Sequence, residues 1–476
     1  MSIKLWAEGS NLDALTSSRV GLLKFGLIIL LTLLMNVSII AQEQPADSSI
    51  SHPHRNALIH TLAQPTFIWA TNWYLLDQFW ADISIKTLQN NIEAGWVWDE
   101  DGFDVNQVGH PTQGALVYTA ARAQGLSYWE SIAYPTLASL IWELGMENES
   151  PSINDMITTP MSGVAFGEII HRLSALTLGS GHAKPLSRQI LTGLINPMGY
   201  GVNRLIIGKS IHQNFSGQPT NLLSELAVGG GPGYHETSGP SQNVPRRFIR
   251  FSLIYGNPLA QTGNFKPFDN FNFVTILNFN RTDYVGEIYA SGMLGKLYSR
   301  YTEQSKLVVA VFQNYDFMNQ DDYKVSSSSV GPGIIHAYSL SPALILGTHV
   351  NGSFIFMGSA GDISDDLEVR DYHFGQGFST KFMSRLMWRD KGQAYIRLKR
   401  YFIYAMEDVH IQGYENINLL TAGGQLKIGK QYGLGLEYML AGRTVSYLDI
   451  DRDETLQRTS SYRFYFSYYL ADSLFD

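Results

Sequence analysis

The sequence predicts an α+β protein in two parts, an N-terminal α-helical domain followed by an antiparallel transmembrane β-barrel of about twelve strands. Three observations predict this architecture. Apolar residues recur at helical spacing up to about residue 215. After about residue 245 they alternate with polar residues over stretches of about ten residues. A segment typical of a secretory signal stands near the N-terminus.

Residues 1–41 have the order of charge and hydropathy that a secretory signal requires. Basic residues precede the apolar stretch Gly26–Met35, and small residues follow it up to Ala41. The apolar stretch is shorter than the roughly 20 residues that a membrane-spanning helix needs. An uncleaved anchor is the alternative. We predict a signal peptide over residues 1–41 and a flexible segment over residues 42–60.

The composition narrows the class of protein. The 476 residues contain no cysteine, so the sequence predicts neither a disulfide scaffold nor a lipoprotein anchor. The formal net charge is −8, and no basic tract stands out. Because nucleic-acid binding relies on clustered basic residues, nucleic acid is not expected as a partner.

Residues 61–215 are expected to form the helical domain. Stretches with helical spacing or helix-start signals are residues 65–90, 111–124, 127–146, 154–175 and 185–196. A tryptophan stripe from Trp69 to Trp80 either touches lipid headgroups or covers the helix bundle. Residues 127–144 are mostly apolar but contain Glu130 and Pro135. We expect a helix packed against protein there, not one that spans a membrane.

Residues 216–246 are rich in Gly, Pro and Ser, and we expect a linker there. The run GGGPG, residues 229–233, lacks the Lys-Ser/Thr ending of a phosphate-binding loop. A nucleotide site is therefore not expected in this segment.

Residues 247–476 are expected to form an outer-membrane β-barrel. Alternation over about ten residues is typical of a strand with one buried face, and that length suits a tilted strand in a bilayer. In the stretch SYRFYFSYYL, Tyr462, Phe464 and Phe466 share one face. About twelve such stretches lie between Phe248 and Ala471. A soluble β-sandwich, which also alternates, is the alternative.

The loops and the lumen of this barrel are expected to be polar. Long polar loops are expected at Gln313 to Asp322, Gly361 to Asp371 and Asp449 to Arg458. Basic residues fall on the face expected to point inward: Lys381, Arg385, Arg389, Arg397 and Lys399. They either form a cationic lumen or pair with Asp and Glu across a closed barrel. Side chains nearly fill the lumen of a twelve-stranded barrel, because open channels usually need more strands. A channel through this barrel is therefore an alternative and not the expectation.

Three stretches of the helical half carry a recognisable pattern: WVWDEDGFDVNQVGHPTQGALVYTAARAQGLSYWES, IWELGMENESPSINDMITTPMSGVAFGEIIHRLS and LINPMGYGVNRLIIG. With DYHFGQG in the barrel half, they resemble a bacterial family known as a domain of unknown function. The resemblance implies a helical periplasmic-side region joined to an outer-membrane-like barrel, over roughly residues 60–470. It implies no established activity. The matching positions are Asp99, Asn106, His110, Pro111, Gly114, Arg122, Gly125, Ser131, Trp142, Glu143, Asn154, Asp155, Gly163, Gly167, Glu168, Arg172, Asn203 and Arg204.

The candidate site consists of polar residues that stand in apolar stretches of the helical half. Burying a charged side chain is costly unless it has a partner, so such residues are expected to pair or to bind something. The catalytic candidates are His110, Glu143 and Glu168, with Glu130 as a further buried carboxylate. The candidate binding residues are Asp155, Arg122, Arg172, Arg204 and Asn203. If the carboxylates converge on the histidine, they would form an acid–base site or bind a divalent cation.

The alternative is a set of structural ion pairs. Glu168 would pair with Arg172 one turn further on, and Glu143 or Asp155 would pair with Arg122 or Arg204. No metal site is predicted, because the spacing from Glu168 to His171 occurs once, whereas carboxylate-bridged metal proteins carry two such motifs. No cofactor can be identified, and no nucleophile motif supports a hydrolase.

The sequence therefore favours a non-catalytic outer-membrane component that binds lipid or another envelope protein, with the helical domain on the periplasmic side. Outer-membrane lipid is the expected partner. An envelope hydrolase acting on lipid or cell-wall material through a His/Glu cluster is one alternative. A small-solute channel is the other. Whether the protein is an enzyme is left open.

Overall fold

The computed structural model describes residues 52–179, 185–207, 223–236, 244–259, 265–279, 284–320, 323–361, 372–389, 391–406, 413–429, 431–448 and 455–472. The expected signal peptide, residues 1–41, lies outside these residues. The expected flexible segment, residues 42–60, is cut short by the first helix, which already begins at Pro53. Proline suits the first helical turn because its missing N–H has no partner there in any case.

The helical domain comprises the elements from α2 to α9. They are α2 (Pro53–Tyr74), η1 (Phe79–Ala81), α3 (Ile85–Ala94), η2 (Val105–Gly109), α4 (His110–Ala123), α5 (Tyr128–Ser131), α6 (Ala133–Gly145), α7 (Ile153–Leu178), α8 (Leu186–Ile195), η3 (Pro197–Val202) and α9 (Asn203–Ile207). The helices expected near residues 111–124, 154–175 and 185–196 are present. None of the helices among the described residues is both long and apolar enough to cross a membrane.

The helix expected over residues 65–90 is wrong, because the chain forms three elements there. Asp77 has a positive φ of 50°, which interrupts a helix. Ser84 then starts α3 by accepting a hydrogen bond from the backbone N–H of Thr87, a capping box. Within the tryptophan stripe, Trp69 donates to the carbonyl of Ala81, and Trp80 packs on Trp142 of α6. These two indoles therefore cover the helix bundle.

Helices α4 and α7 make the closest helix crossing, through small residues. A Cβ added to Gly114 would lie 2.0 Å from the backbone oxygen of Thr159. A Cβ on Gly163 would lie 2.7 Å from the Cα of Gly114, and one on Gly167 would meet the ring of Tyr118 at 2.6 Å. Gly163 and Gly167 therefore leave room on α7 for the close approach of α4. This crossing fixes how α7 is presented to the barrel.

The second part is a closed antiparallel barrel in which neighbouring strands follow the chain order and β1 pairs with β12. The strands are β1 (Leu223–Glu236), β2 (Val244–Tyr255), β3 (Phe271–Asn278), β4 (Val285–Tyr301), β5 (Ser305–Asn319), β6 (Lys324–Ser341), β7 (Leu344–Gly361), β8 (Tyr372–Trp388), β9 (Gly392–Ala405), β10 (Gly413–Ile428), β11 (Tyr432–Tyr447) and β12 (Thr455–Asp472). The expected closed antiparallel barrel of about twelve strands is confirmed, and the β-sandwich alternative is wrong.

The linker expected over residues 216–246 is corrected by the structure, because it contains β1 and the start of β2. The glycines that suggested a linker instead allow the neighbouring strands to approach. A Cβ on Gly231 would lie 2.1 Å from the backbone oxygen of Phe464 on β12. Glycine is therefore required where β1 closes the barrel.

The polar loop expected from Gln313 to Asp322 is also corrected, because Gln313 to Asn319 form the end of β5. Polar residues point to both faces of this strand, which hides its alternation. Of the other expected loops, residues 362–371 and 449–454 lie outside the described residues. Strand β12 begins at Thr455, inside the loop expected up to Arg458.

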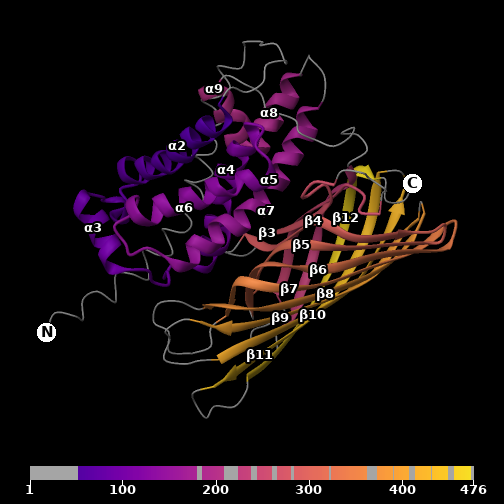
Figure 1. Cartoon of the computed structure of the whole chain (residues 1–476). Helices are drawn as coiled ribbons and strands as arrows, with labels where there is room; N and C mark the ends of the chain where they lie inside the picture. The colour runs from indigo at the N-terminus through magenta and orange to yellow at the C-terminus, as the bar shows by residue number, and fades with distance from the viewer. Residues whose placement is uncertain are drawn as a thin grey trace.

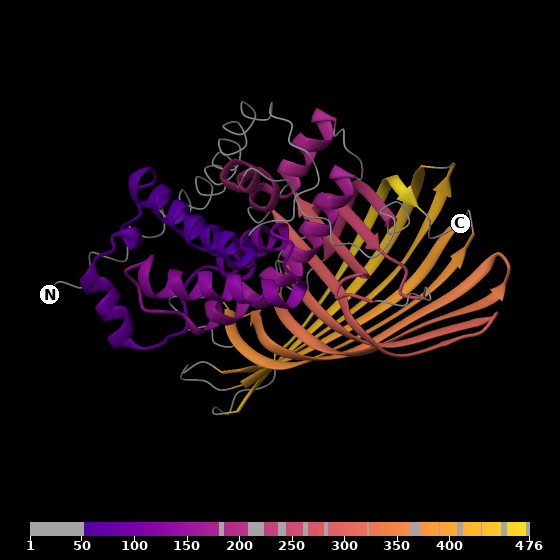
Figure 2. The ribbon, with the colours of Figure 1, turned by 45° about the horizontal axis from the view of Figure 1, so that its top comes forward.

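The helical domain packs against the outside of the barrel wall. In β5 the side chains of Gln313, Tyr315 and Phe317 contact Tyr128, Phe166 and Phe103 of the helical domain. The intervening Asp316 points into the lumen, where it pairs with Lys381. Figures 1 and 2 show the helices lying against one side of the barrel.

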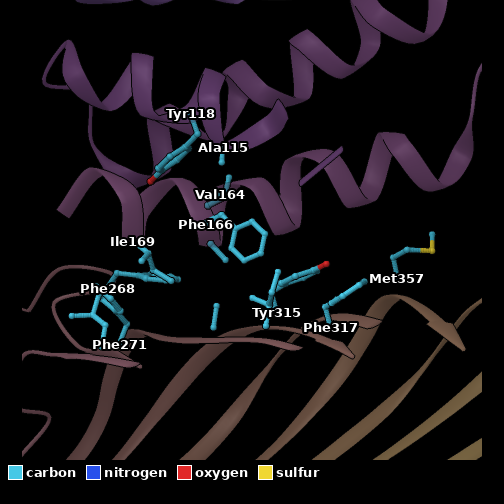
Figure 3. Close-up of a cluster of buried hydrophobic side chains, with 14 of the residues drawn as sticks. Ala115, Tyr118, Val164, Phe166, Ile169, Phe268, Phe271, Tyr315, Phe317 and Met357 are labelled. Atoms are coloured by element: carbon cyan, nitrogen blue, oxygen red, sulfur yellow. The ribbon is translucent and has the colours of Figure 1, made fainter. Parts of the chain in front are cut away.

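A shared hydrophobic core joins the two parts (Figure 3). From the helical side it includes Phe103, Ala115, Tyr118, Tyr128, Val164, Phe166 and Ile169. From the barrel side it includes Leu253, Tyr255, Phe268, Phe271, Ile288, Ala290, Tyr315, Phe317, Met357, Tyr372 and Phe374. We call this outer face of β2–β8 the covered wall. Because the two parts share one core, they form one packed unit.

Candidate functional site

Glu168 lies at the centre of a buried ion-pair cluster with Arg122 and Arg172. Arg122 Nε donates to Glu168 Oε2 at 2.7 Å, and Arg172 Nε donates to Glu168 Oε1 at 2.8 Å. The Tyr118 hydroxyl adds a third donor at 2.8 Å. Burial opposes ionisation, yet the two arginines lower the pKa of Glu168 below its ordinary value. This carboxylate is compensated and structural.

Arg172 also reaches the barrel side of the interface. Its Nη1 lies 2.9 Å from Asp269 Oδ1, and its Nη2 donates to the carbonyl of Pro267 at 2.7 Å. The Glu168 cluster therefore helps fix α7 on the covered wall. Of the pairings considered from the sequence, the one between Glu168 and Arg172 is present.

His110, Glu143 and Asp155 converge from three different helices, and we call them the His110 cluster. Their possible ligand atoms all lie within 4.8 Å of one another. His110 Nδ1 lies 3.6 Å from Asp155 Oδ1. Glu143 and Asp155 are 1% and 2% exposed, and the side chain of His110 is 13% exposed. Asp99 and Asp101 form a second such group with the same histidine.

Backbone and amide groups hold the carboxylates of the His110 cluster in place. The N–H of Ser152 donates to Glu143 Oε2 at 2.7 Å, and Asn154 Nδ2 donates to Asp155 Oδ1 at 2.9 Å. The Thr159 hydroxyl lies 3.4 Å from His110 Nδ1. Within the described part of the chain, no Lys or Arg forms an ion pair with Glu143 or Asp155.

The electrostatics of the two clusters are opposite. Burial, together with the nearby Asp155, raises the pKa of Glu143 to about 8. Burial also raises the pKa of Asp155 well above its ordinary value, and Asp99 and Asp101 add to the shift. These carboxyl groups are destabilised as anions, in contrast to Glu168. A group with such a pKa can exchange a proton near neutral pH or lose it to a bound cation.

The hydrolase alternative predicts that His110, Glu143 and Glu168 lie close together. In the described part of the chain, His110 and Glu143 do so, whereas Glu168 lies in the cluster with Arg122 and Arg172. Arg122 pairs with Glu168, so it does not compensate Glu143 as the sequence allowed. Glu130 is not buried: it caps α5 through the backbone N–H of Ser127.

Arg204 and Asn203, the remaining binding candidates, belong to a separate polar network. Arg204 donates to Gln189 at 2.6 Å and to the Tyr200 hydroxyl at 3.0 Å. The Asn203 side-chain oxygen accepts from Gln124 at 2.5 Å and lies 3.1 Å from His60 Nε2. These contacts join α9 to α2, α4 and α8.

Asn106, Asn154 and Tyr372 connect the His110 cluster to the barrel, and sequence reasoning did not select them as site residues. Asn154 Nδ2 donates to Asn106 Oδ1 at 3.4 Å, and Asn106 Nδ2 donates to the Tyr372 hydroxyl at 2.7 Å. The Asn154 side-chain oxygen Oδ1 accepts from the backbone N–H of Asp99 at 2.9 Å. Asn106 and Asn154 are both among the positions that match the family. That match is the sequence feature that could have identified them as site residues.

The lumen of the barrel contains charged pairs and packed side chains. Glu437 accepts from Arg250 at 2.8 Å and from Arg397 at 2.6 Å, and Asp316 pairs with Lys381 and Lys399. A buried apolar cluster reaches across the lumen from strands β5, β7, β9, β10 and β11: Met318, Ile355, Tyr401, Ile403, Ile417, Leu419 and Ala441. A cavity of about 160 Å³ remains beside Asp316 and Lys381. At these positions the basic residues pair across the barrel.

A row of polar residues crosses the outer wall away from the helical domain. Strand pairing sets Thr380 beside Arg400, Arg400 beside Asn418, Asn418 beside Gly442, and Gly442 beside Arg458. We call these residues the arginine row. Next to it lies a groove of about 560 Å³, lined on its apolar side by Val350, Phe382, Leu398, Leu420 and Leu440. The lining contains no Asp or Glu.

No curated protein matches the sequence. Among solved structures, the NanC porin is 12% identical, with 51% of this chain and 98% of that chain covered and a TM-score of 0.26. OmpT of Vibrio cholerae is 8% identical (51% and 96% covered, TM-score 0.22). The outer membrane channel DcaP of Acinetobacter baumannii is 10% identical (52% and 96% covered, TM-score 0.23).

A family model described as a domain of unknown function, DUF3943, matches residues 95–198. This segment holds His110, Glu143, Asp155 and Glu168, so both buried clusters lie within it. It also contains most of the motif positions on which the resemblance was based. The resemblance of this chain to a family of uncharacterised proteins is therefore confirmed through the DUF3943 domain at residues 95–198.

Proposed function

We propose that this chain is an outer-membrane β-barrel protein with a non-catalytic role in the cell envelope, and that its outer wall binds lipid. The observation that carries the proposal is the outer face of β9–β12, which is apolar and exposed. Leu434 is 51% exposed and Phe464 is 56% exposed. Other exposed apolar side chains on these strands are Ile396, Leu398, Leu426, Ile428, Leu436, Leu440, Tyr462 and Phe466. So large an exposed apolar surface favours contact with lipid.

The helical domain offers a second apolar surface. In α8 the side chains of Leu186, Ile190, Leu191 and Leu194 are all exposed. They recur at helical spacing, which is typical of a helix that lies along a membrane interface. Both parts of the chain therefore carry surfaces that lipid would cover.

The filled lumen supports a role other than solute transport. The ion pairs of Glu437 and Asp316 and the apolar cluster around Tyr401 occupy the space that a channel would need. In planar bilayers we expect the purified chain to give no conductance steps. Steps in the presence of wild-type protein, absent from empty bilayers, would replace this proposal with the channel.

The arginine row suggests which lipid is bound. Arg400 and Arg458 are exposed beside an apolar groove without acidic residues, and a guanidinium binds phosphate in a bidentate manner. We infer that the groove takes an acyl chain while the two arginines hold a phosphorylated lipid headgroup.

A double variant tests this assignment. Arg400→Gln with Arg458→Gln should reduce the phosphorylated lipid retained by the detergent-purified protein, measured by native mass spectrometry with added anionic lipid. Arg247→Gln, an exposed arginine that does not line the groove, is the matched control and should retain lipid as the wild type does. Equal retention in all three proteins would contradict the lipid site.

The helical domain is proposed to lie on the periplasmic side of the membrane. The domain contacts the end of β5 near Phe317, and the turn at Glu303 lies at the other end of that strand, so the proposal requires the Phe317 end of β5 to be periplasmic. The chain has no cysteine, so single cysteines can be introduced as reporters. Lys86→Cys in α3 should react with a membrane-impermeant maleimide after the outer membrane is permeabilised, and Glu303→Cys should react in intact cells. The reverse pattern would place the helices outside the cell.

The membrane proposal as a whole has a simpler test. Residues 42–476, expressed without the signal segment, should need detergent to stay dispersed. A chain that stays monodisperse in buffer without detergent would contradict the proposal that the outer wall contacts lipid.

A further inference from the structure

The His110 cluster contains buried carboxylates that, among the described residues, pair with no Lys or Arg. Glu143 and Asp155 are almost fully buried. Among the described residues, the ion-pair partner of Asp155 is the His110 imidazole, which carries a charge only when it is protonated. Burying an uncompensated carboxylate is costly. Glu168 in the same domain shows the usual solution, because it is equally buried and holds two arginines. The contrast indicates that a different positive charge belongs beside Glu143 and Asp155.

We propose that His110, Glu143 and Asp155 bind a divalent transition-metal ion. One imidazole with two carboxylates is a ligand set used by zinc, manganese and iron sites, and the imidazole disfavours calcium and magnesium, which prefer oxygen ligands. Asp99 and Asp101 form a second group around His110 and would supply further oxygen ligands.

Hydrogen bonds from neighbouring groups orient the two carboxylates of the His110 cluster. Metal-binding carboxylates are usually oriented by hydrogen bonds from neighbouring groups. Here the backbone N–H of Ser152 holds Glu143, and the side-chain amide of Asn154 holds Asp155. The N–H of Ser152 bonds Oε2 of Glu143, and the Ser152 side chain is a second hydrogen-bond partner of Asp155. The backbone and an amide therefore fix the ligands without neutralising them.

An ion can reach the cluster from solvent. His110 is partly exposed, and Asp101 is exposed at the rim, so the ligands lead from the surface to the buried pair. Protonation of the carboxylates is the competing way to remove their charge. A metal ion and a proton would compete for the same oxygens, so binding should strengthen as the pH rises.

The test uses the untagged full chain in detergent, stripped with a chelator and titrated with Co²⁺ at pH 8. Cobalt bound by nitrogen and oxygen ligands has visible absorption bands, so binding is seen directly. We expect one saturable site in the wild type, which Zn²⁺ displaces. His110→Ala and Glu143→Gln should each weaken Co²⁺ binding at least tenfold.

Matched controls separate this site from general effects. His336→Ala, a barrel histidine that contacts Ser305, and Glu130→Gln, at the start of α5, should bind Co²⁺ as the wild type does. Near-ultraviolet circular dichroism checks that each variant is folded, and Asp155→Asn serves in place of any variant that is not. A wild type without cobalt bands, or cluster variants that bind as the controls do, would overturn the proposal. The outcome does not depend on lipid binding by the barrel.

Discussion

The side-chain amide of Asn106 donates a hydrogen bond to the hydroxyl of Tyr372 at 2.7 Å, across the boundary between the helical domain and strand β8. The same hydroxyl donates to the carbonyl oxygen of Asp101 at 2.6 Å. Tyr372 is fully buried and belongs to the shared core. One barrel side chain thus fixes the segment that carries two acidic residues of the candidate metal site.

Tyr372→Phe should destabilise the protein by about 1–3 kcal/mol, because it leaves buried partners without their hydrogen bond. The midpoint of chemical denaturation in detergent measures the loss. Tyr438→Phe, on the outer wall facing Tyr462, is the control and should change the midpoint little. Equal midpoints for Tyr372→Phe and the wild type would mean that the contact contributes nothing to stability.

Gly114→Ala should destabilise the α4–α7 crossing by about 1–3 kcal/mol or more, because the new methyl group would overlap the backbone of Thr159. The matched change is Gly102→Ala, where a Cβ would meet nothing within 4 Å. The difference in thermal midpoint between the two variants reports the crossing. A difference near zero would show that the helices separate without cost.

Glu168→Gln should cost about 3–5 kcal/mol at neutral pH, because it leaves Arg122 buried without its anion and leaves Arg172 with Asp269 alone. The pKa of Glu168 is lowered on folding, so its contribution is present above the ordinary pKa of 4.5 and is lost only as the pH falls through the lower folded value. The stability difference between wild type and variant should therefore hold from pH 5 to pH 8. A difference that vanishes at pH 5 would contradict this assignment.

Glu143 should give the opposite pH dependence in metal-free protein. Its pKa is raised from 4.5 to about 8 on folding, so its contribution is fully present below pH 4.5 and is lost as the pH rises through about 8. Chelated wild type should thus lose thermal stability between pH 5 and pH 9, while Glu143→Gln should lose less. Parallel pH profiles would show that Glu143 does not keep its proton in the folded chain.

The barrel was predictable because its evidence is local and repeated along the chain. Alternation identifies strands such as β12 without knowledge of their neighbours. It failed at Gln313 to Asn319, where one face of β5 meets the helical domain and the other meets lumen charges, so both faces carry polar residues. It failed again at residues 229–233, where glycine serves strand closure and resembles a linker in sequence.

The candidate site was only partly predictable, because sequence shows which residues are out of place but not which partner each one has. Glu143 and Glu168 look alike in sequence as acidic residues in apolar helices. In the structure the first meets His110 and Asp155, and the second meets two arginines. The angle at which α4 crosses α7 decides this, and no local pattern encodes it.

The covered wall also constrains how the molecule is assembled. The face of β2–β8 that holds Phe166 and Phe103 cannot be occupied by acyl chains and by helices at the same time. If the barrel spans the membrane as proposed, insertion of a bare cylinder would bury that face in the bilayer, and docking of the helices would then have to displace lipid from it. A route in which the helices engage the nascent sheet before it enters the membrane avoids that step.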